Sequence, residues 1–221
     1  MQFKTEIKTK ICGISSMESL EAAIVGGAAA VGFVFFPASP RFVNIKAASK
    51  LIAEVPKNVL RVGLIVNMGD RDLIEIVDNL TLDMLQLHGD ETPKRALEIK
   101  ERADLPIIKA IRVAAPSDIS RADPYKSLVE NILFDAMPPK DMKQALPGGN
   151  AVSFNWNWLG DKKLPYPWML SGGLNAKNVE TAVKTSGASF VDVSSGVEKR
   201  PGSKDPVMIK EFLDVTSKIE K

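Results

Sequence analysis

The sequence contains a single cysteine, Cys12, and a single histidine, His88, among its 221 residues. A lone thiol cannot close a disulfide within the chain, a pattern typical of proteins in a reducing compartment. The N-terminal stretch "MQFKTEIKTK" alternates charged and apolar residues and lacks the apolar centre of a secretory signal peptide. These features predict a cytoplasmic protein.

The chain also lacks a long hydrophobic segment and an excess of charge. Its longest mostly apolar run, Ile24 to Ala38, is interrupted by three glycines and is shorter than the ~20 residues that cross a bilayer. Lys and Arg number 29 and Asp and Glu 27, so the net charge is only +2, and no basic block is present. We therefore expect neither a membrane protein nor a partner of nucleic acids.

The sequence instead alternates between two kinds of segment. Short apolar runs, typical of buried parallel strands, are followed by longer amphipathic segments with helical spacing. The predicted strands are residues 9–14, 29–36, 60–66, 82–88, 105–111, 131–136, 168–173 and 189–195. Seven of the eight segments that follow them are helical or partly helical in pattern, most clearly 16–27, 45–55, 71–80, 92–103 and 176–187. The exception follows the sixth strand: a Pro/Gly-rich loop over 137–150, with at most a short helix over 154–159.

Capping signals mark several helix ends. Ser15 with Glu18 predicts a capping box at the start of the first helix. Asp205 before Pro206 predicts the N-cap of the last helix, followed by proline at its first position. Gly187 is the predicted C-cap of the segment before the last strand.

Eight strand–helix units in 221 residues give roughly 28 residues per unit, close to the smallest size of an eightfold βα barrel. An open doubly wound sheet would alternate in the same way. The barrel is favoured because no Gly-x-Gly-x-x-Gly turn follows the first strand and the strands recur evenly to the C-terminus. We therefore predict the α/β class, with a single (β/α)8 TIM-barrel domain over residues 1–221.

Reactive side chains gather where such a barrel carries its active site, at the C-terminal ends of the strands. Cys12, His88, Asp135 and Asp192 lie at four strand ends, and Arg41 follows a fifth. Each alone has an ordinary structural explanation, such as a buried thiol or a surface arginine. Together they predict a catalytic site, because buried ionisable groups are costly unless they are paired or used.

The last two strands are followed by turns of glycine and serine, where barrels commonly bind phosphate. Glycines let backbone N–H groups approach phosphate oxygens, and a helix N-terminus adds a favourable potential. The predicted phosphate ligands are Gly172, Gly173, Ser194, Ser195 and Gly196. A phosphorylated small-molecule substrate is therefore expected.

Six motifs together resemble the phosphoribosylanthranilate isomerase family. In chain order they are "KICG", "SPR", "QLHGDE", "LFDA", "LSGGL" and "VDVSSGVE", from about Lys10 to Gly202. The resemblance implies an Amadori rearrangement in tryptophan biosynthesis, from N-(5-phosphoribosyl)anthranilate to 1-(o-carboxyphenylamino)-1-deoxyribulose 5-phosphate. It implies no metal and no organic cofactor, since the chemistry is proton movement.

The resemblance also implies roles for individual residues. Asp135 would protonate the ring oxygen, which requires burial to keep it protonated near neutral pH. Cys12 would remove the C2 proton as a thiolate stabilised by positive potential. Arg41 would bind the anthranilate carboxylate through its planar fork, and His88 and Asp192 would line the substrate.

One position departs from the family pattern. After the sixth strand the family usually carries Gly-Gly-Thr/Ser-Gly before a Phe-x-Trp, whereas this chain has "GGNA" and then "FNW". Ala151 therefore stands where glycine is usual. If its φ is positive, alanine costs about 1 kcal/mol there, and the loop closes differently.

Other phosphate-binding barrels remain alternatives. The aminoaldose isomerase of histidine biosynthesis uses a pair of aspartates, and Cys12 at the first strand argues against it. Indole-3-glycerol phosphate synthase needs a lysine acid, for which only Lys109 is well placed, and Asp135 makes that acid unnecessary. A non-catalytic barrel would be expected to lose Cys12 or Asp135. The oligomeric state is left open between monomer and homodimer.

Overall fold

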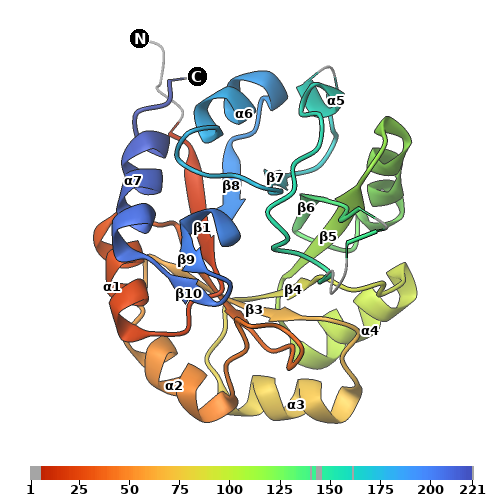
Figure 1. Ribbon diagram of the computed structural model, residues 1–221. Coiled ribbons are helices and arrows are strands. Elements are labelled where there is room, and N and C mark those ends of the chain that lie inside the picture. Colours follow the sequence, from red (N-terminus) through yellow and green to blue (C-terminus); the bar gives the residue numbers. More distant parts are fainter. Residues whose placement is uncertain (1–5, 140, 143–145, 161, 221) are drawn as a thin grey trace.

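The computed structural model of the chain describes residues 6–139, 141–142, 146–160 and 162–220 (Figure 1). Within them, eight parallel strands form a closed barrel in chain order, and β8 pairs with β1. The strands are β1 (Lys8–Cys12), β2 (Ala30–Val34), β3 (Leu60–Ile65), β4 (Met84–Leu87), β5 (Ile107–Val113), β6 (Asn131–Ala136), β7 (Trp168–Leu170) and β8 (Phe190–Val193). The predicted TIM barrel is confirmed.

Helices surround the barrel and connect its strands (Figure 1). They are α1 (Met17–Val25), α2 (Ile45–Ala53), α3 (Asp70–Asn79), α4 (Pro93–Ala103), α5 (Asn157–Gly160), α6 (Val179–Ser186) and α7 (Pro206–Thr216). Two further connections are 3-10 helices, η1 (Pro116–Tyr125) after β5 and η2 (Ser195–Val197) after β8. The predicted short helix after the sixth strand is α5. As far as the chain is described, no helix is long and apolar enough to span a membrane.

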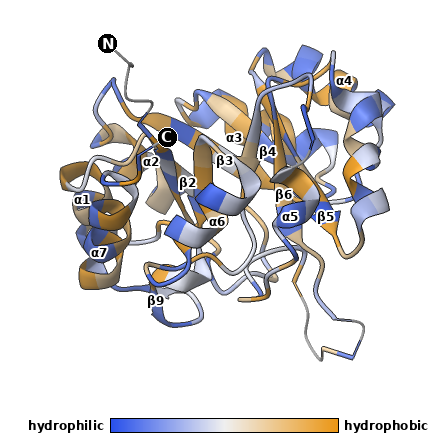
Figure 2. Ribbon diagram, turned by 90° about the horizontal axis from the view of Figure 1, so that it is seen from above, coloured by the Kyte–Doolittle hydropathy of each residue, from blue (hydrophilic) through white to orange (hydrophobic). Residues whose placement is uncertain are grey.

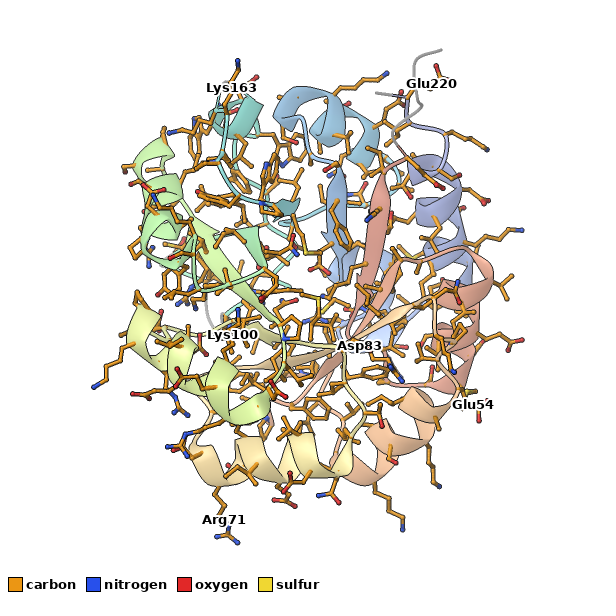
Figure 3. All side chains as sticks on the ribbon, turned by 180° about the vertical axis from the view of Figure 1, so that it is seen from behind. Glu54, Arg71, Asp83, Lys100, Lys163 and Glu220 are labelled. Atoms are coloured by element: carbon orange, nitrogen blue, oxygen red, sulfur yellow. The ribbon has the colours of Figure 1, made fainter. Side chains whose placement is uncertain are left out.

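The hydrophobic core has an outer and an inner part. The outer part lies between strands and helices, where Ile11 shares one cluster with Leu20 and Phe212. Figure 2 shows hydrophobic strands inside and helices of mixed hydropathy around them, and Figure 3 shows charged side chains such as Glu54 and Arg71 pointing away from the barrel. Side chains alternate along a strand, so Lys10 and Cys12, on either side of Ile11, point into the barrel.

Two predicted caps are confirmed. Asp205 is the N-cap of α7 and its carboxylate accepts the Val207 N–H at 2.9 Å, with Pro206 at the first helical position. Gly187 is the C-cap of α6 and has a φ of 76°, in the left-handed region where glycine costs little. The residues at the caps therefore determine where α7 begins and where α6 ends.

The predicted capping box at the start of α1 is wrong. The N-cap is Ser16, whose Oγ accepts the Ser19 N–H at 3.3 Å. The helix begins at Met17, one residue later than the pattern placed it, and a serine rather than Glu18 therefore occupies the third helical position. Ser15 and Ser16 could each cap the helix by residue type, so the path of the backbone after β1 decides which serine does.

A short antiparallel hairpin was not predicted. Strands β9 (Glu198–Arg200) and β10 (Ser203–Lys204) follow η2 at the C-terminal end of the barrel. Their sequence is polar and too short to show strand periodicity. The barrel strands β7 and β8 are shorter than predicted, since the residues after Leu170 and Val193 leave the barrel as turns. These turns and the hairpin shape the end of the barrel where the reactive residues gather.

Candidate active site

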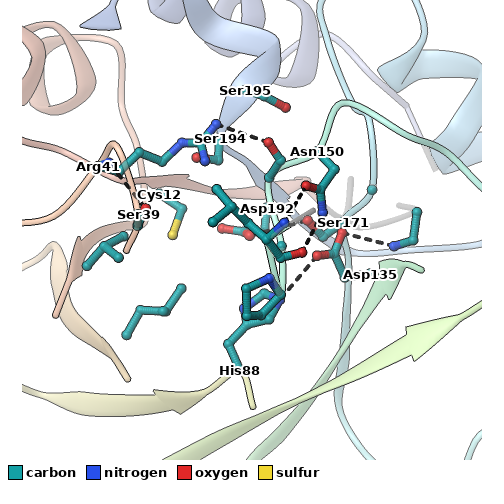
Figure 4. Close-up of a pocket in the computed structure, with 18 of the residues that line it drawn as sticks. Cys12, Ser39, Arg41, His88, Asp135, Asn150, Ser171, Asp192, Ser194 and Ser195 are labelled. Carbon is teal, nitrogen blue, oxygen red and sulfur yellow. Dashed lines mark hydrogen bonds and ion pairs between the residues drawn. The ribbon is translucent and has the colours of Figure 1, made fainter. Parts of the chain in front are cut away.

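A pocket with an empty volume of about 700 Å³ opens at the C-terminal ends of the strands (Figure 4). Nine of the ten predicted site residues line it: Cys12, Arg41, His88, Asp135, Gly172, Gly173, Asp192, Ser194 and Ser195. Gly196 is not among the lining residues. Figure 4 shows Cys12 on one side of the pocket and His88 with Asp135 on the other, with Asp192 between them.

The Cys12 side of the pocket contains a buried ion pair. Lys10 is fully buried, and its Nζ donates to Asp192 Oδ1 at 2.7 Å. The two residues are direct neighbours in the pairing of β1 with β8. Burial raises the pKa of the Cys12 thiol; the positive charges of Lys10 and Lys204 oppose this increase, and the Asp192 carboxylate adds to it.

Asp135 belongs to a chain of three buried side chains. Its Oδ2 lies 3.1 Å from His88 Nε2, and His88 Nδ1 lies 2.8 Å from Gln86 Nε2. The other carboxylate oxygen, Oδ1, accepts the N–H of Ala136 at 2.9 Å. Gln86 Oε1 is buried and has no hydrogen-bond partner among the described residues.

This chain suits either protonation state of Asp135. A neutral imidazole donates from one ring nitrogen and accepts at the other. When the Gln86 amide donates to Nδ1, the proton of His88 sits on Nε2 and points at an ionised Asp135. When the amide is turned over, Oε1 accepts from Nδ1–H, and Nε2 accepts from a protonated Asp135. The acid therefore has a hydrogen-bond partner before and after it gives up its proton.

Arg41 is held by Glu198, the last residue of the "VDVSSGVE" motif, for which no role was predicted. Its Nε and Nη2 donate to the two oxygens of Glu198 at 2.8 and 2.9 Å, and Nη2 also donates to Gly149 O at 3.1 Å. Lys204 Nζ donates to Glu198 Oε1 at 2.7 Å and to Ser194 O at 2.8 Å. Two cations against one carboxylate leave this buried corner with an excess of positive charge, which favours an anionic ligand.

Burial disfavours the charged form of both Glu198 and Lys204, but the net shifts of their pKa values have different causes. Burial disfavours the charged form of Glu198, but the hydrogen bonds from Arg41 and Lys204 outweigh this effect and lower its pKa. Burial lowers the pKa of Lys204 to about 8, against the attraction of Glu198. Glu198 is therefore ionised at neutral pH, and Lys204 titrates closer to neutrality than an ordinary lysine.

The two predicted phosphate turns need glycine for backbone and steric reasons. Gly172 and Gly173 have φ values of 92° and 63°, and a Cβ on Gly172 would lie 2.8 Å from Ala136 N. A Cβ on Gly196 would lie 1.8 Å from the carbonyl oxygen of Leu174. Packing therefore explains Gly196, whereas a phosphate-binding role for it stays a prediction.

The loop residue Ala151 has a φ of 56°, the left-handed conformation that the family's glycine suggested. The preceding Asn150 braces this loop, because its side chain accepts the Leu146 N–H at 3.0 Å and donates to Leu146 O at 2.7 Å. The strained backbone of Ala151 therefore lies next to a turn that the Asn150 side chain closes by its hydrogen bonds to Leu146. Residues 140 and 143–145 of the predicted 137–150 loop lie outside the described residues.

Lys109, the lysine required by the alternative synthase, does not line the pocket. Its Nζ donates to Glu91 Oε2 at 2.8 Å and to Gly89 O at 2.8 Å, and both side chains of this ion pair are buried. This pair anchors the loop that follows His88. The position gives no support to a lysine acid in the pocket.

Several residues that contact the predicted site were missed, among them Lys10, Gln86, Glu198 and Lys204. Lys10 and Gln86 left a signal, because each is a polar residue within an apolar strand and stands two positions before a predicted site residue. Alternation along a strand places such pairs on one face. Glu198 and Lys204 left no comparable signal, since the hairpin that carries them was not predicted.

Metal ligation is a separate question. Where the chain is described, no three or more of its His, Cys, Asp and Glu side chains are arranged to hold a metal ion. The expectation of a reaction without metal or organic cofactor stays a prediction.

Comparisons with known proteins agree with this geometry. A family model described as "PRAI: N-(5'phosphoribosyl)anthranilate (PRA) isomerase" matches residues 9–215. The N-(5'-phosphoribosyl)anthranilate isomerase of Parvibaculum lavamentivorans is 48% identical over 207 residues, which cover 94% of this chain and 96% of that protein. The phosphoribosyl anthranilate isomerase structure from Thermotoga maritima is 35% identical with a TM-score of 0.84, covering 95% of this chain and 98% of that one.

A further solved structure is similar and carries a ligand. It is a phosphoribosyl anthranilate isomerase in complex with reduced 1-(o-carboxyphenylamino)-1-deoxyribulose 5-phosphate. It is 34% identical with a TM-score of 0.81, and the match covers 95% of this chain and 98% of that one. The barrel, the pocket and these matches lead to one conclusion: the chain belongs to the N-(5'-phosphoribosyl)anthranilate isomerase family.

Proposed function

We propose that the pocket converts N-(5'-phosphoribosyl)anthranilate into 1-(o-carboxyphenylamino)-1-deoxyribulose 5-phosphate, an isomerisation in tryptophan biosynthesis. The observation that carries the proposal is the placement of a carboxyl group, Asp135, and a thiol, Cys12, on opposite sides of one pocket. This Amadori rearrangement needs an acid at the ring oxygen bound to C1 and a base at the proton of the neighbouring C2. The positively charged corner and the glycine turns supply sites for the two anionic ends of the substrate.

Asp135 is the proposed acid of the first step. It gives its proton to the ring oxygen as the bond between that oxygen and C1 breaks, and the lone pair of the anthranilate nitrogen forms an iminium. The hydrogen bond from His88 then stabilises the carboxylate that remains. General acid catalysis of this kind contributes on the order of 10²–10⁴-fold in rate.

Cys12 is the proposed base of the second step. As a thiolate it takes the C2 proton, and the electrons of that C–H bond neutralise the iminium and give an enolamine. The enolamine then tautomerises to the ketone. Burial raises the pKa of the thiol in the empty pocket, and a bound iminium adds the positive charge that favours the thiolate.

Arg41 and the glycine turns are the proposed anion sites. Glu198 already engages Nε and Nη2 of Arg41, so the substrate carboxylate would approach along the Nη1 edge. The phosphate would bind at the turns after β7 and β8, where Ser194 is held by Lys204. Asp192 would contact the substrate between these two ends.

We further propose one domain over residues 1–221, acting in the cytoplasm as a monomer or homodimer without metal or organic cofactor. The closed barrel supports the single domain, and the lone cysteine is compatible with a reducing compartment.

Turnover tests the reaction itself. Freshly generated N-(5'-phosphoribosyl)anthranilate should be consumed by the purified chain, as followed by the loss of anthranilate fluorescence. Chelator should leave the rate unchanged. A chain that bound the reduced product analogue without consuming substrate would refute the proposed function and favour a non-catalytic barrel.

A further inference from the structure

Lys10 occupies a position that no role in the proposed reaction explains. It is a lysine with no exposed surface inside the barrel, two residues before Cys12 on the same face of β1. Burying an ammonium group is costly unless it is paired. Asp192 pairs with it at 2.7 Å, yet a neutral pair of residues at this depth would fill the same space without that cost.

The geometry around Gly32 brings the ammonium and the thiol together. Gly32 pairs with Cys12 across β1 and β2. A Cβ built on Gly32 would lie 2.9 Å from Cys12 Sγ and 3.2 Å from Lys10 Nζ. Both atoms therefore crowd the same point, which is free because residue 32 has no side chain.

The charges that face Cys12 come from three strands. Lys10 lies on β1, Asp192 on β8 and Lys204 on β10, while β2 and β3 contribute the uncharged Val34 and Leu64. Lys10 has the strongest favourable effect on the thiolate among these groups, ahead of Lys204. Burial disfavours the charged lysine, but attraction to Asp192 and Cys12 outweighs it and raises the pKa of Lys10. The ammonium thus stays charged when the thiol ionises.

We infer that Lys10 is a positioning residue for Cys12. Asp192 holds the Lys10 ammonium group beside the Cys12 sulfur, where it stabilises the thiolate form. The inference rests on the proposed function in one respect, that Cys12 is the base. Asp192 then has two tasks, since it contacts the pocket and also fixes the ammonium. Lys10 itself does not line the pocket, so it would act on the reaction only through Cys12.

A purely structural role is the competing explanation: Lys10 would only neutralise Asp192 so that the barrel folds. The two roles differ in their effect on Cys12 when both members of the ion pair are made neutral. If Lys10 is only structural, the effect left at the sulfur is the loss of the Asp192 carboxylate, which favours the thiolate. The wild type and the Lys10→Met/Asp192→Asn double variant therefore form the decisive pair. The double variant buries no unpaired charge at these two positions, so it avoids the folding defect expected for Lys10→Met or Asp192→Asn alone.

The experiment measures Cys12 directly, because it is the only cysteine in the chain. The rate of alkylation by iodoacetamide, without substrate, is recorded from pH 6 to 10.5 for the wild type, for the double variant and for Lys8→Met, which replaces an exposed lysine of the same strand. We expect Lys8→Met to match the wild type. We expect the double variant to react at least roughly tenfold more slowly near pH 8 than the wild type, with its midpoint at higher pH.

A double variant that reacts as fast as the wild type, or faster, would overturn the inference and leave Lys10 a structural residue. This readout is independent of the proposed function. Turnover by Cys12→Ser at the wild-type rate would refute Cys12 as the base even if Lys10 shifted the thiol as expected.

Discussion

At the scale of single residues, the site is built from buried charges that hold one another in place. Glu198 is the clearest case, since it pairs with both Arg41 and Lys204 and is itself buried. Removing the partner of a buried charge leaves that charge without compensation, which costs several kcal/mol. Residues that never touch the substrate therefore decide whether the substrate ligands are in position.

The Glu198→Gln variant should consequently lose about 3 kcal/mol of unfolding free energy, measured by urea denaturation. The matched control is Glu180→Gln, which removes an exposed i,i+4 pair with Lys184 and should change stability by less than about 0.5 kcal/mol. Equal effects of the two variants would show that the Arg41–Glu198–Lys204 corner contributes no more than a surface pair.

Ala151 gives a prediction of opposite sign. Its φ of 56° is strained for alanine, so Ala151→Gly should raise the unfolding free energy by up to about 1 kcal/mol. Ala114→Gly, at an exposed loop position without a positive φ, should lower it by about 0.4–1 kcal/mol. Destabilisation by both variants would mean that the loop holds Ala151 without strain.

At the scale of elements, the outcome of prediction followed the apolar pattern. The barrel strands lie in apolar runs, and even β7, with three residues, is apolar throughout. The β9–β10 hairpin is polar, and its residues Glu198 and Lys204 reach the site only through tertiary structure. Cys12, His88 and Asp135 could be found because strand ends in a barrel meet at one edge, whereas the Arg41–Glu198 pair required the hairpin's position.

Two variants at the start of α1 test which serine caps this helix. Ser16→Ala removes the Oγ that accepts the Ser19 N–H and should cost about 1 kcal/mol of stability. Ser15→Ala, one residue earlier, should be close to neutral. Thermal unfolding of the two variants is the measurement, and a larger loss for Ser15→Ala would restore the capping box that the sequence pattern predicted.

At the scale of the whole molecule, stability should depend on acid pH through a few carboxylates. Hydrogen bonds from Arg61 lower the pKa of Asp83 despite its partial burial. The pKa of Glu198 is also lowered, by its hydrogen bonds and ion pairs with Arg41 and Lys204. A carboxylate with a lower pKa in the folded state stabilises the fold above its unfolded pKa, and this contribution is lost as the pH falls through the folded value.

The urea midpoint should therefore be steady near neutrality and fall as the pH drops below about 4.5, the ordinary value for glutamate. The Glu198→Gln variant, already less stable, should show a shallower decline over the same range. A decline of unchanged slope would mean that Glu198 takes no part in the acid response.

The acid–base pair is the centre of the whole account, and substrate deuterated at C2 tests it most directly. Wild type, Cys12→Ser and Asp135→Asn are compared for consumption of protonated and deuterated substrate. Both variants should be slower by roughly 10²-fold or more. Only Cys12→Ser should show a large isotope effect, because its slow step is removal of the C2 proton, whereas ring opening limits Asp135→Asn. A Cys12→Ser variant that retains the wild-type rate, or shows no isotope effect when slow, would contradict the assignment of Cys12 as the base.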